Sequence, residues 1–248
     1  MTDPDKLLPI LKTRPSDLAS HALVVGDPKR AAFAAELLTN SEEVGCYREY
    51  KTFTGEFAGK RVTISSHGVG GAGASICFEE LIQGGVKTII RAGTCGAMRE
   101  GIQDGELIIG TGAIREDGTS ERLIPIAYPA IADRHVISAL EAAATAQNYS
   151  RLHEGIILTQ GYFYNGILPH TTDIWLEADI NVCAVEMELA TLLIIAGLHG
   201  VQAGGIFTSD GNLTRKADRM EYNPHRNVVE EGVSTMLKIA LDALARLA

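Results

Sequence analysis

The stretch from residue 22 to residue 38 reads ALVVGDPKRAAFAAELL and contains the signals of a strand, a turn and a helix. Its first four residues are all apolar, which is typical of a short buried strand. A turn at residues 26–28 follows, and Pro28 suits the first turn of a helix that we expect to run over residues 29–38. This stretch predicts one strand–loop–helix unit of an α/β fold.

The same order recurs along the rest of the chain and predicts the fold class. We expect a hairpin of residues 49–57 and 61–65, further strands at 86–92, 106–114, 154–159 and 201–208, and further helices at 74–83, 133–147, 185–196 and 228–247. Such alternation favours a central mixed, largely parallel sheet flanked by helices, an α/β sandwich. Because no linker, repeat or low-complexity stretch interrupts it, we expect residues 1–248 to form a single domain.

Composition and charge exclude several classes of protein. The net charge of −9 argues against a general nucleic-acid-binding surface, which needs a basic excess. The apolar runs are too short to cross a bilayer, and the first residues lack the apolar core of a signal peptide. None of the four cysteines forms a CxxC pair or lies at metal-ligand spacing with a histidine. We therefore expect free thiols, no metal, no membrane partner and a soluble cytoplasmic protein.

The segment GVGGAG at residues 68–73 fits the dinucleotide-binding pattern GxGxxG, between a predicted strand and a predicted helix. A dinucleotide site also needs an acidic residue at the end of the next strand, but residues 87–93 contain Arg91 and no acid. An NADP site could use an arginine, so this alternative stays open. The other interpretation is a flexible turn that lets the backbone approach a ligand closely.

The expected ligand site lies where the strands of such a sheet end, at residues 26–30, 67–73, 93–96 and 209–212. Arg30 and Arg91 lie in or next to these segments, and Arg48 lies in Tyr47-Arg48-Glu49-Tyr50. A planar guanidinium can bind two phosphate oxygens at once, and a helix start offers free amides to an anion. A single arginine is more often a solvated surface charge, so the three together are what favours a phosphate site.

Six separated segments occur in an order that is recognisable. They are VGDPxR at 25–30, REY at 48–50, SHGVG at 66–70, IRAGTCG at 90–96, VEMELAT at 185–191 and GGIFTSDG at 204–211. From about residue 23 to the C-terminal helix, the chain resembles the nucleoside phosphorylases of the family that includes hexameric purine nucleoside phosphorylase and uridine phosphorylase. The resemblance implies phosphorolysis of a nucleoside to free base and pentose 1-phosphate, with phosphate as a co-substrate and no cofactor.

The resemblance also implies a role for particular residues. The phosphate site would comprise Gly26, Arg30, Arg91 and Thr94, completed by Arg48 of a neighbouring subunit in a homohexamer built as a trimer of dimers. Ribose would contact Met187 and Glu188, and the base would contact Phe163, Val185, Glu186 and Asp210. Asp210 and Arg91 would be the catalytic residues.

Two of these assignments have simpler alternatives. Glu186 and Glu188 are two residues apart on the predicted helix and would point in nearly opposite directions, so we assign the sugar to Glu188 and only a weaker, helix-start contact to Glu186. Phe163, in Tyr162-Phe163-Tyr164, could instead belong to the core.

Three positions bear on which nucleoside the chain would prefer. Uridine phosphorylases carry a Gln and an Arg where this chain has Ile167 and Pro169, and Asp210 occupies the position of an acid for purine N7. An aspartate before glycine is otherwise a common turn former, and this one must be partly desolvated to hold a proton. We therefore expect a purine, with uridine phosphorylase as the alternative.

Three further points stay open. Ile10 stands where the family usually places a histidine for the ribose 5′-hydroxyl, so a 5′-methylthionucleoside phosphorylase or nucleosidase is a further alternative. A nucleoside-binding protein without activity is another. The loop at residues 212–223 has no assigned role.

Overall fold

The computed structural model describes residues 5–164, 166–167, 171–178, 180–215 and 222–247. The strands are β1 (His21–Val25), β2 (Thr39–Tyr47), β3 (Tyr50–Phe57), β4 (Lys60–Ser66), β5 (Thr88–Ala97), β6 (Leu107–Glu116), β7 (Ala130–Ile131), β8 (Leu152–Gln160), β9 (Val182–Glu186) and β10 (Gln202–Asn212). The helices are η1 (Pro15–Asp17), α1 (Pro28–Ala35), α2 (Gly71–Gln83), α3 (Ser120–Leu123), α4 (Arg134–Ala146), α5 (Thr171–Glu177), α6 (Leu189–His199) and α8 (Asn227–Leu247).

These ten strands form one mixed sheet in the order β10-β6-β8-β9-β5-β1-β4-β3-β2, with β7 beside β6. The central pairs β10–β5, β5–β1 and β1–β4 are parallel, whereas β2, β3 and β4 form an antiparallel meander. Because β10 pairs with both β5 and β6, the strands β10, β6, β8, β9 and β5 close into a ring. The predicted α/β fold class is confirmed, with this partial closure as an added feature.

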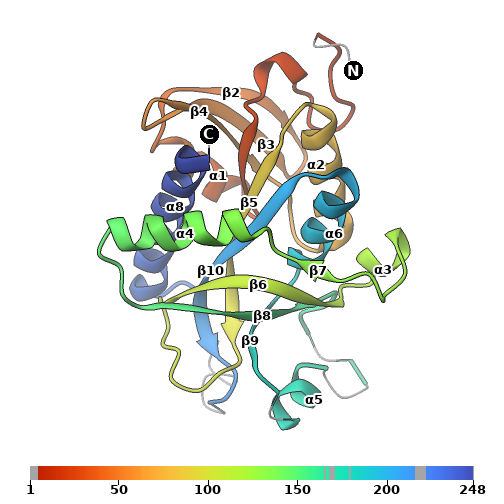
Figure 1. The fold of residues 1–248 in the computed structure, drawn as a ribbon, viewed down its shortest axis with the longest axis vertical. Helices are drawn as coiled ribbons and strands as arrows, with labels where there is room; N and C mark the ends of the chain where they lie inside the picture. Colours follow the sequence, from red (N-terminus) through yellow and green to blue (C-terminus); the bar gives the residue numbers. More distant parts are fainter. Residues whose placement is uncertain (1–4, 165, 168–170, 179, 216–221, 248) are drawn as a thin grey trace.

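Helices cover the sheet in two groups, and each group has its own apolar core. Helices α2 and α6 pack together on one side, and α1, α4 and α8 pack on the other (Figure 1). The first eight residues of α6 are all buried, so this helix is apolar all round and lies inside the molecule. The two cores hold the central strands between them and fix the strand ends that carry the site.

The first predicted unit forms as expected. Strand β1 is buried, and the Asp27 side chain caps α1 by accepting a hydrogen bond from the Lys29 amide at 2.8 Å. Helix α1 begins at Pro28 but ends at Ala35, three residues before the predicted end. Residues 36–38 form a turn instead, and β2 begins at Thr39.

Two segments that we predicted as loops belong to strands. Residues 93–96 lie within β5, and residues 209–212 lie within β10, because these two strands pair in parallel almost throughout. Their register shifts between Ser209 and Gly211, which places an irregularity beside Asp210. These two predicted ligand segments are therefore neighbouring strand ends, held by backbone hydrogen bonds.

The predicted helix at residues 185–196 is wrong at its start. Val185 and Glu186 end β9, which pairs in parallel with β8, and helix α6 begins only at Leu189. Glu188 is the N-cap residue, with φ −141° and ψ −9°. The backbone thus changes from strand to helix between the two glutamates.

The glycine-rich segment after β4 serves close packing at the start of α2. Gly68 and Gly70 have φ of 76° and 89°, a conformation that residues with a side chain rarely adopt. A Cβ atom on Gly71 would lie 2.5 Å from Oγ1 of Thr191 on α6. The turn geometry accounts for Gly68 and Gly70, and the contact with α6 accounts for Gly71, without a dinucleotide.

None of the helices within the described ranges combines the length and the apolar character that a membrane span requires.

Candidate active site

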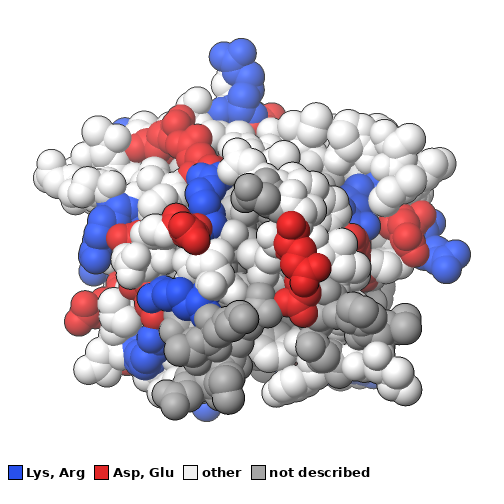
Figure 2. All heavy atoms as spheres, turned by 90° about the horizontal axis from the view of Figure 1, so that it is seen from below, with Lys and Arg blue, Asp and Glu red and all other residues white. Residues whose placement is uncertain are grey.

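A cavity of about 1300 Å³ opens where β1, β4, β5, β9 and β10 end. This end of the molecule carries both acidic and basic side chains in small separate groups (Figure 2). The cavity is lined by nearly every residue that the sequence analysis proposed, namely Gly26, Arg30, Arg91, Thr94, Phe163, Val185, Glu186, Met187, Glu188 and Asp210. The fold thus brings together segments from five separate parts of the chain.

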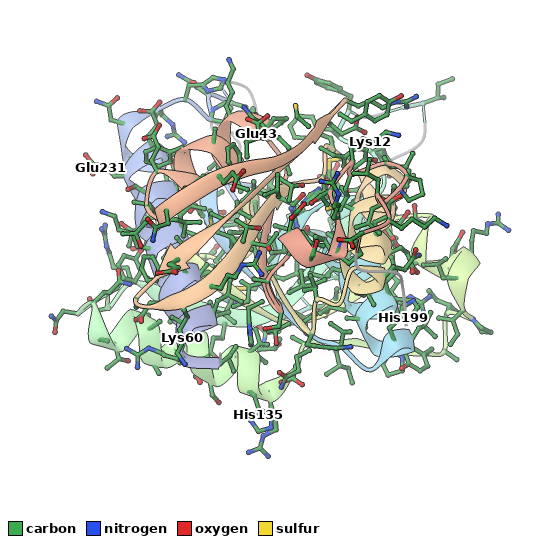
Figure 3. The ribbon with its side chains drawn as sticks, turned by 90° about the horizontal axis from the view of Figure 1, so that it is seen from above. Lys12, Glu43, Lys60, His135, His199 and Glu231 are labelled. Carbon is green, nitrogen blue, oxygen red and sulfur yellow. The ribbon has the colours of Figure 1, made fainter. Side chains whose placement is uncertain are left out.

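Arg48 is the proposed residue that the described part of the chain does not place in the cavity lining. It lies at the turn between β2 and β3 with φ 55°, exposed, and its guanidinium lies 5.4 Å from the centre of the Tyr47 ring. The Lys12 ammonium lies 5.8 Å from the centre of the same ring, and Figure 3 shows Lys12 and Glu43 on the side of the molecule that β2 borders. Its assignment to a neighbouring subunit's site stays a prediction.

Arg91 on β5 lies at the centre of a buried charge network. Its Nε donates to Glu186 at 3.0 Å, its Nη2 donates to Glu188, and its Nη1 donates to Nε2 of His67 at 2.8 Å. Burial opposes the charged form, but the carboxylates of Glu188 and Glu186 outweigh it and raise the pKa of Arg91. Arg91 is therefore a permanent cation held in one orientation.

His67 is a member of this network to which sequence reasoning gave no role, although it lies within the matched SHGVG segment. It is fully buried, and burial together with the Arg91 charge lowers the pKa of its imidazole well below the ordinary value. A neutral imidazole can accept a hydrogen bond at one nitrogen only. Since Arg91 can only donate, Nε2 accepts and the proton lies on Nδ1.

Glu186 and Glu188 do not point in opposite directions, which corrects the helix-based prediction. The Glu186 carboxylate accepts hydrogen bonds from the backbone amides of Glu188 and Leu189 at 2.8–3.0 Å, so it does contact the start of α6. It also accepts from Thr159 at 2.7 Å. Both carboxylates reach Arg91 because the backbone between them is the end of a strand and a helix cap.

Glu188 is buried, and burial raises the pKa of its carboxyl even though Arg91 lies beside it. A carboxylate under this desolvation gains from every further donor that reaches it. Sugar hydroxyls are such donors, which is consistent with the role that the sequence analysis gave to this residue.

Asp210 lies on β10 and is only 6% exposed. Burial raises the pKa of its carboxyl to about 6, against the opposing effects of hydrogen bonds from Tyr222 and Thr94 and of the Arg30 charge. The Tyr222 hydroxyl donates to Oδ2 of Asp210 at 2.8 Å. Asp210 can therefore hold a proton near neutral pH, as the sequence analysis required of a general acid.

Arg30, at the start of α1, interacts electrostatically with both Arg91 and Asp210. Burial and the nearby charge of Arg91 lower the pKa of its guanidinium, whereas Asp27 and Asp210 raise it. Two partly desolvated guanidinium groups that repel each other favour an anion between them. The part of the cavity that lies next to Arg30 and Arg91 is thus suited to phosphate.

The aromatic wall is formed by Phe163 and Tyr222, whose ring centres are 5.8 Å apart. Phe163 is 55% exposed, so it is not a core residue. Sequence reasoning missed several lining residues, namely Glu49, Gln160, Tyr162, Asp173, Leu213 and Tyr222. Glu49 lies in the matched REY segment, which was a usable signal, but Tyr222 lies in the loop that had no assigned role.

The other residues that the sequence analysis used to choose the substrate do not appear among the described residues that line the cavity. Ile167 is fully exposed, and Pro169 lies outside the described residues, so the purine assignment depends on Asp210. Ile10 packs against the core of its own chain, and its amide donates to the Glu80 carboxylate at 2.9 Å.

Comparison with known proteins places this site in a family. Residues 20–245 match the model of the Phosphorylase superfamily, and the chain belongs to that family. It is 36% identical to a guanosine phosphorylase of Halorubrum lacusprofundi, covering 96% of this chain and 98% of the relative. It is 33% identical to a uridine phosphorylase of Treponema pallidum, covering 92% and 90%.

A solved structure gives the same result. The purine nucleoside phosphorylase of Toxoplasma gondii, in complex with immucillin-H, superposes with a TM-score of 0.92 at 31% identity and covers 100% of this chain and 98% of that one. The fold and the family that the sequence predicted are confirmed.

Proposed function

We propose that this chain is a purine nucleoside phosphorylase, which converts a purine ribonucleoside or deoxyribonucleoside and phosphate into the free base and a pentose 1-phosphate. Nucleoside phosphorylases, of both the purine and the uridine type, are its relatives, and they are pentosyltransferases. The observation that carries the purine assignment is Asp210, a buried carboxyl with a pKa of about 6 in the same cavity as Arg30 and Arg91.

The phosphate would bind at the end of the cavity formed by Gly26, Arg30, Arg91 and Thr94. Arg91 is already oriented by His67 and by two carboxylates, so little side-chain freedom is lost when an anion binds. Phosphate oxygens would compete with Glu188 for Arg91 donors, which frees Glu188 to accept from the sugar hydroxyls. Met187 would pack beside the sugar.

The chemistry would exchange one bond at C1′ for another. A phosphate oxygen attacks C1′ as the bond from C1′ to the base nitrogen breaks, and the electron pair of that bond moves to the base. Asp210 donates its proton to N7 of the purine and becomes a carboxylate. The products are the neutral base and the pentose 1-phosphate, and Asp210 must take up a proton before the next turnover.

A product assay with inosine, adenosine, uridine and methylthioadenosine, each with and without phosphate, tests this function. We expect base release from the purine nucleosides only when phosphate is present, together with equal amounts of pentose 1-phosphate. Equal base release in phosphate-free buffer would indicate a nucleosidase. Faster turnover of uridine than of inosine would indicate a uridine phosphorylase, and binding without turnover would indicate a nucleoside-binding protein.

The proposed assembly is a homohexamer, a trimer of dimers in which Arg48 completes the phosphate site of the neighbouring subunit. The exposed position of Arg48 at the β2–β3 turn supports this, since the side chain is available to a second copy of the chain. Two symmetric copies would then share two equivalent sites.

We expect Arg48→Ala to lower kcat/KM for phosphate roughly 10- to 150-fold, the effect of losing a hydrogen bond to a charged group. Coexpression with Asp210→Asn tests whether Arg48 acts on a neighbour. In a mixed dimer, the site that combines Asp210 of one subunit with Arg48 of the other is intact, and the second site is not. With equal amounts of both chains, half of the dimers are mixed, so random mixing should restore about a quarter of the wild-type activity. If Arg48 acts within its own subunit, the mixture will show no more than the average of the two single variants.

The proposed compartment is the cytoplasm. Its support is that all four cysteines are free thiols, three of them buried, as expected in a reducing environment.

A further inference from the structure

Residues 222–226 lie beside Asp210 and are anchored there. Arg226 donates from Nη2 to the backbone carbonyl of Asp210 at 2.9 Å and from Nε to the carbonyl of Asn223 at 2.9 Å. Its Nη1 pairs with Asp104, in the connection between β5 and β6, at 2.5 Å. These bonds fix residues 222–226 relative to the strand that carries Asp210.

The anchored segment places Tyr222 directly on the Asp210 carboxyl. The Tyr222 hydroxyl donates to Oδ2 at 2.8 Å, while its ring lies against Phe163 with 5.8 Å between ring centres. Burial and the Asp210 carboxyl raise the pKa of the Tyr222 phenol. The phenol therefore keeps its proton throughout the neutral range and acts as a hydrogen-bond donor to Asp210.

We propose that Tyr222 is a positioning residue that holds the Asp210 carboxyl in place and favours its ionised form. An O–H donor stabilises a carboxylate more than it stabilises the neutral acid, because the neutral acid is the weaker hydrogen-bond acceptor. The other groups that face Asp210 are Thr94 and Cys95 on β5 and Arg30 on α1. Of these, Thr94 and Arg30 also favour the ionised form, and burial opposes it.

This role matters for the reaction only if Asp210 is the general acid, so its catalytic consequence rests on the proposed function. After proton transfer Asp210 is a carboxylate in a desolvated site, and the Tyr222 hydroxyl would stabilise that product form. Without the hydroxyl, Asp210 would stay protonated to a higher pH but would release its proton less readily.

The test is Tyr222→Phe, which keeps the ring beside Phe163 and removes only the hydroxyl. Tyr128→Phe, the same change in the connection between α3 and β7, is the matched control. Isotope-edited infrared titration of protein labelled with ¹³C-aspartate measures the carboxyl pKa, and Asp210→Asn identifies the Asp210 signal. We expect Tyr222→Phe to raise the Asp210 pKa by about one unit or more, the effect of losing a hydrogen bond to a charged group.

The pH profile of kcat, measured with inosine at saturating phosphate, should shift together with the Asp210 pKa from the infrared titration. Its alkaline limb should shift upward by the same amount in Tyr222→Phe and stay unchanged in Tyr128→Phe. An unchanged Asp210 pKa in Tyr222→Phe would overturn the inference, even if kcat falls. A shifted pKa in a protein whose inosine turnover survives Asp210→Asn would support the role of Tyr222 and would instead refute the general-acid role of Asp210.

Discussion

Replacing Arg91 with alanine should lower kcat/KM for phosphorolysis roughly 30- to 5000-fold, equivalent to about 2–5 kcal/mol of transition-state stabilisation. Arg91 is buried and donates to Glu186, Glu188 and His67 at once. Its loss removes the cation that we propose for phosphate and leaves two buried carboxylates close together without a counter-charge. Steady-state kinetics with inosine and varied phosphate measures the effect.

Controls must separate catalysis from folding, because unpaired buried carboxylates also destabilise the native state. Arg151→Ala removes an exposed arginine from the start of the β8 region and should leave kcat/KM within a factor of about three, as is usual for surface changes. Arg91→Lys keeps a positive charge but loses the planar fork, so it should fall between the wild type and Arg91→Ala. Thermal unfolding at one protein concentration reports the stability of each variant.

If folded Arg91→Ala retains wild-type kcat/KM for phosphate, Arg91 has no part in anion binding. Its network would then only join β5 to the start of α6, and Arg30 would be the remaining candidate for the phosphate.

The α/β class and the family could be predicted from the sequence because both depend on local signals in a fixed order. Apolar runs and turn residues mark strands and helices wherever they lie, and six short motifs identify the family. The limits of the strands were harder to predict. Residues 93–96 have the composition of a turn, yet they extend β5 because β10 lies beside it along its full length. Pairing between residues more than 100 positions apart leaves no local signal.

The candidate site, like the fold, could be predicted only in part. The residues that line the cavity could be named from motifs, but their interactions could not. The convergence of both glutamates on Arg91 depends on where β9 ends, and the apolar run after residue 188 concealed that boundary. The Tyr222 hydroxyl donates to Asp210, 12 residues earlier in the chain, and no pattern in residues 212–223 indicates this contact. The role of Arg48 stays a prediction.

Replacing Asp210 with asparagine should lower kcat for inosine roughly 10²- to 10⁴-fold, the usual contribution of general acid–base assistance. Asparagine keeps the shape and can still accept a hydrogen bond from Tyr222, but it cannot transfer a proton. The loss should fall mainly on kcat, because proton donation matters most as the bond to the base breaks. The purine of 7-methylguanosine is already cationic and needs no proton at N7, so its phosphorolysis should be nearly indifferent to the change.

The pH dependence of kcat in the wild type should also show that Asp210 acts as an acid. A general acid works only while it is protonated, so kcat with inosine should fall as pH rises through the Asp210 pKa of about 6. In Asp210→Asn this limb should be absent, and with 7-methylguanosine it should be absent in both proteins.

The same substitution should increase stability, which distinguishes lost catalysis from misfolding. The folded-state pKa of Asp210, about 6, lies above the ordinary value of 3.8 for an aspartate, so the native state binds this proton more tightly than the unfolded chain does. Stability contributed by the protonated carboxyl is therefore full below about pH 4 and is lost as pH rises to about 6. At pH 7 the buried carboxylate costs about 3 kcal/mol, from a pKa difference of about two units.

Asparagine carries no charge and avoids this cost, so Asp210→Asn should be more stable than the wild type by about 1–3 kcal/mol at pH 7, with the gap closing near pH 4. Urea unfolding at both pH values and one protein concentration measures the difference. A variant that is stable, slow with inosine and normal with 7-methylguanosine would identify Asp210 as the acid. A variant that turns over inosine at the wild-type rate would leave the carboxyl without a catalytic role, and the preference for a purine would lose the observation that carries it.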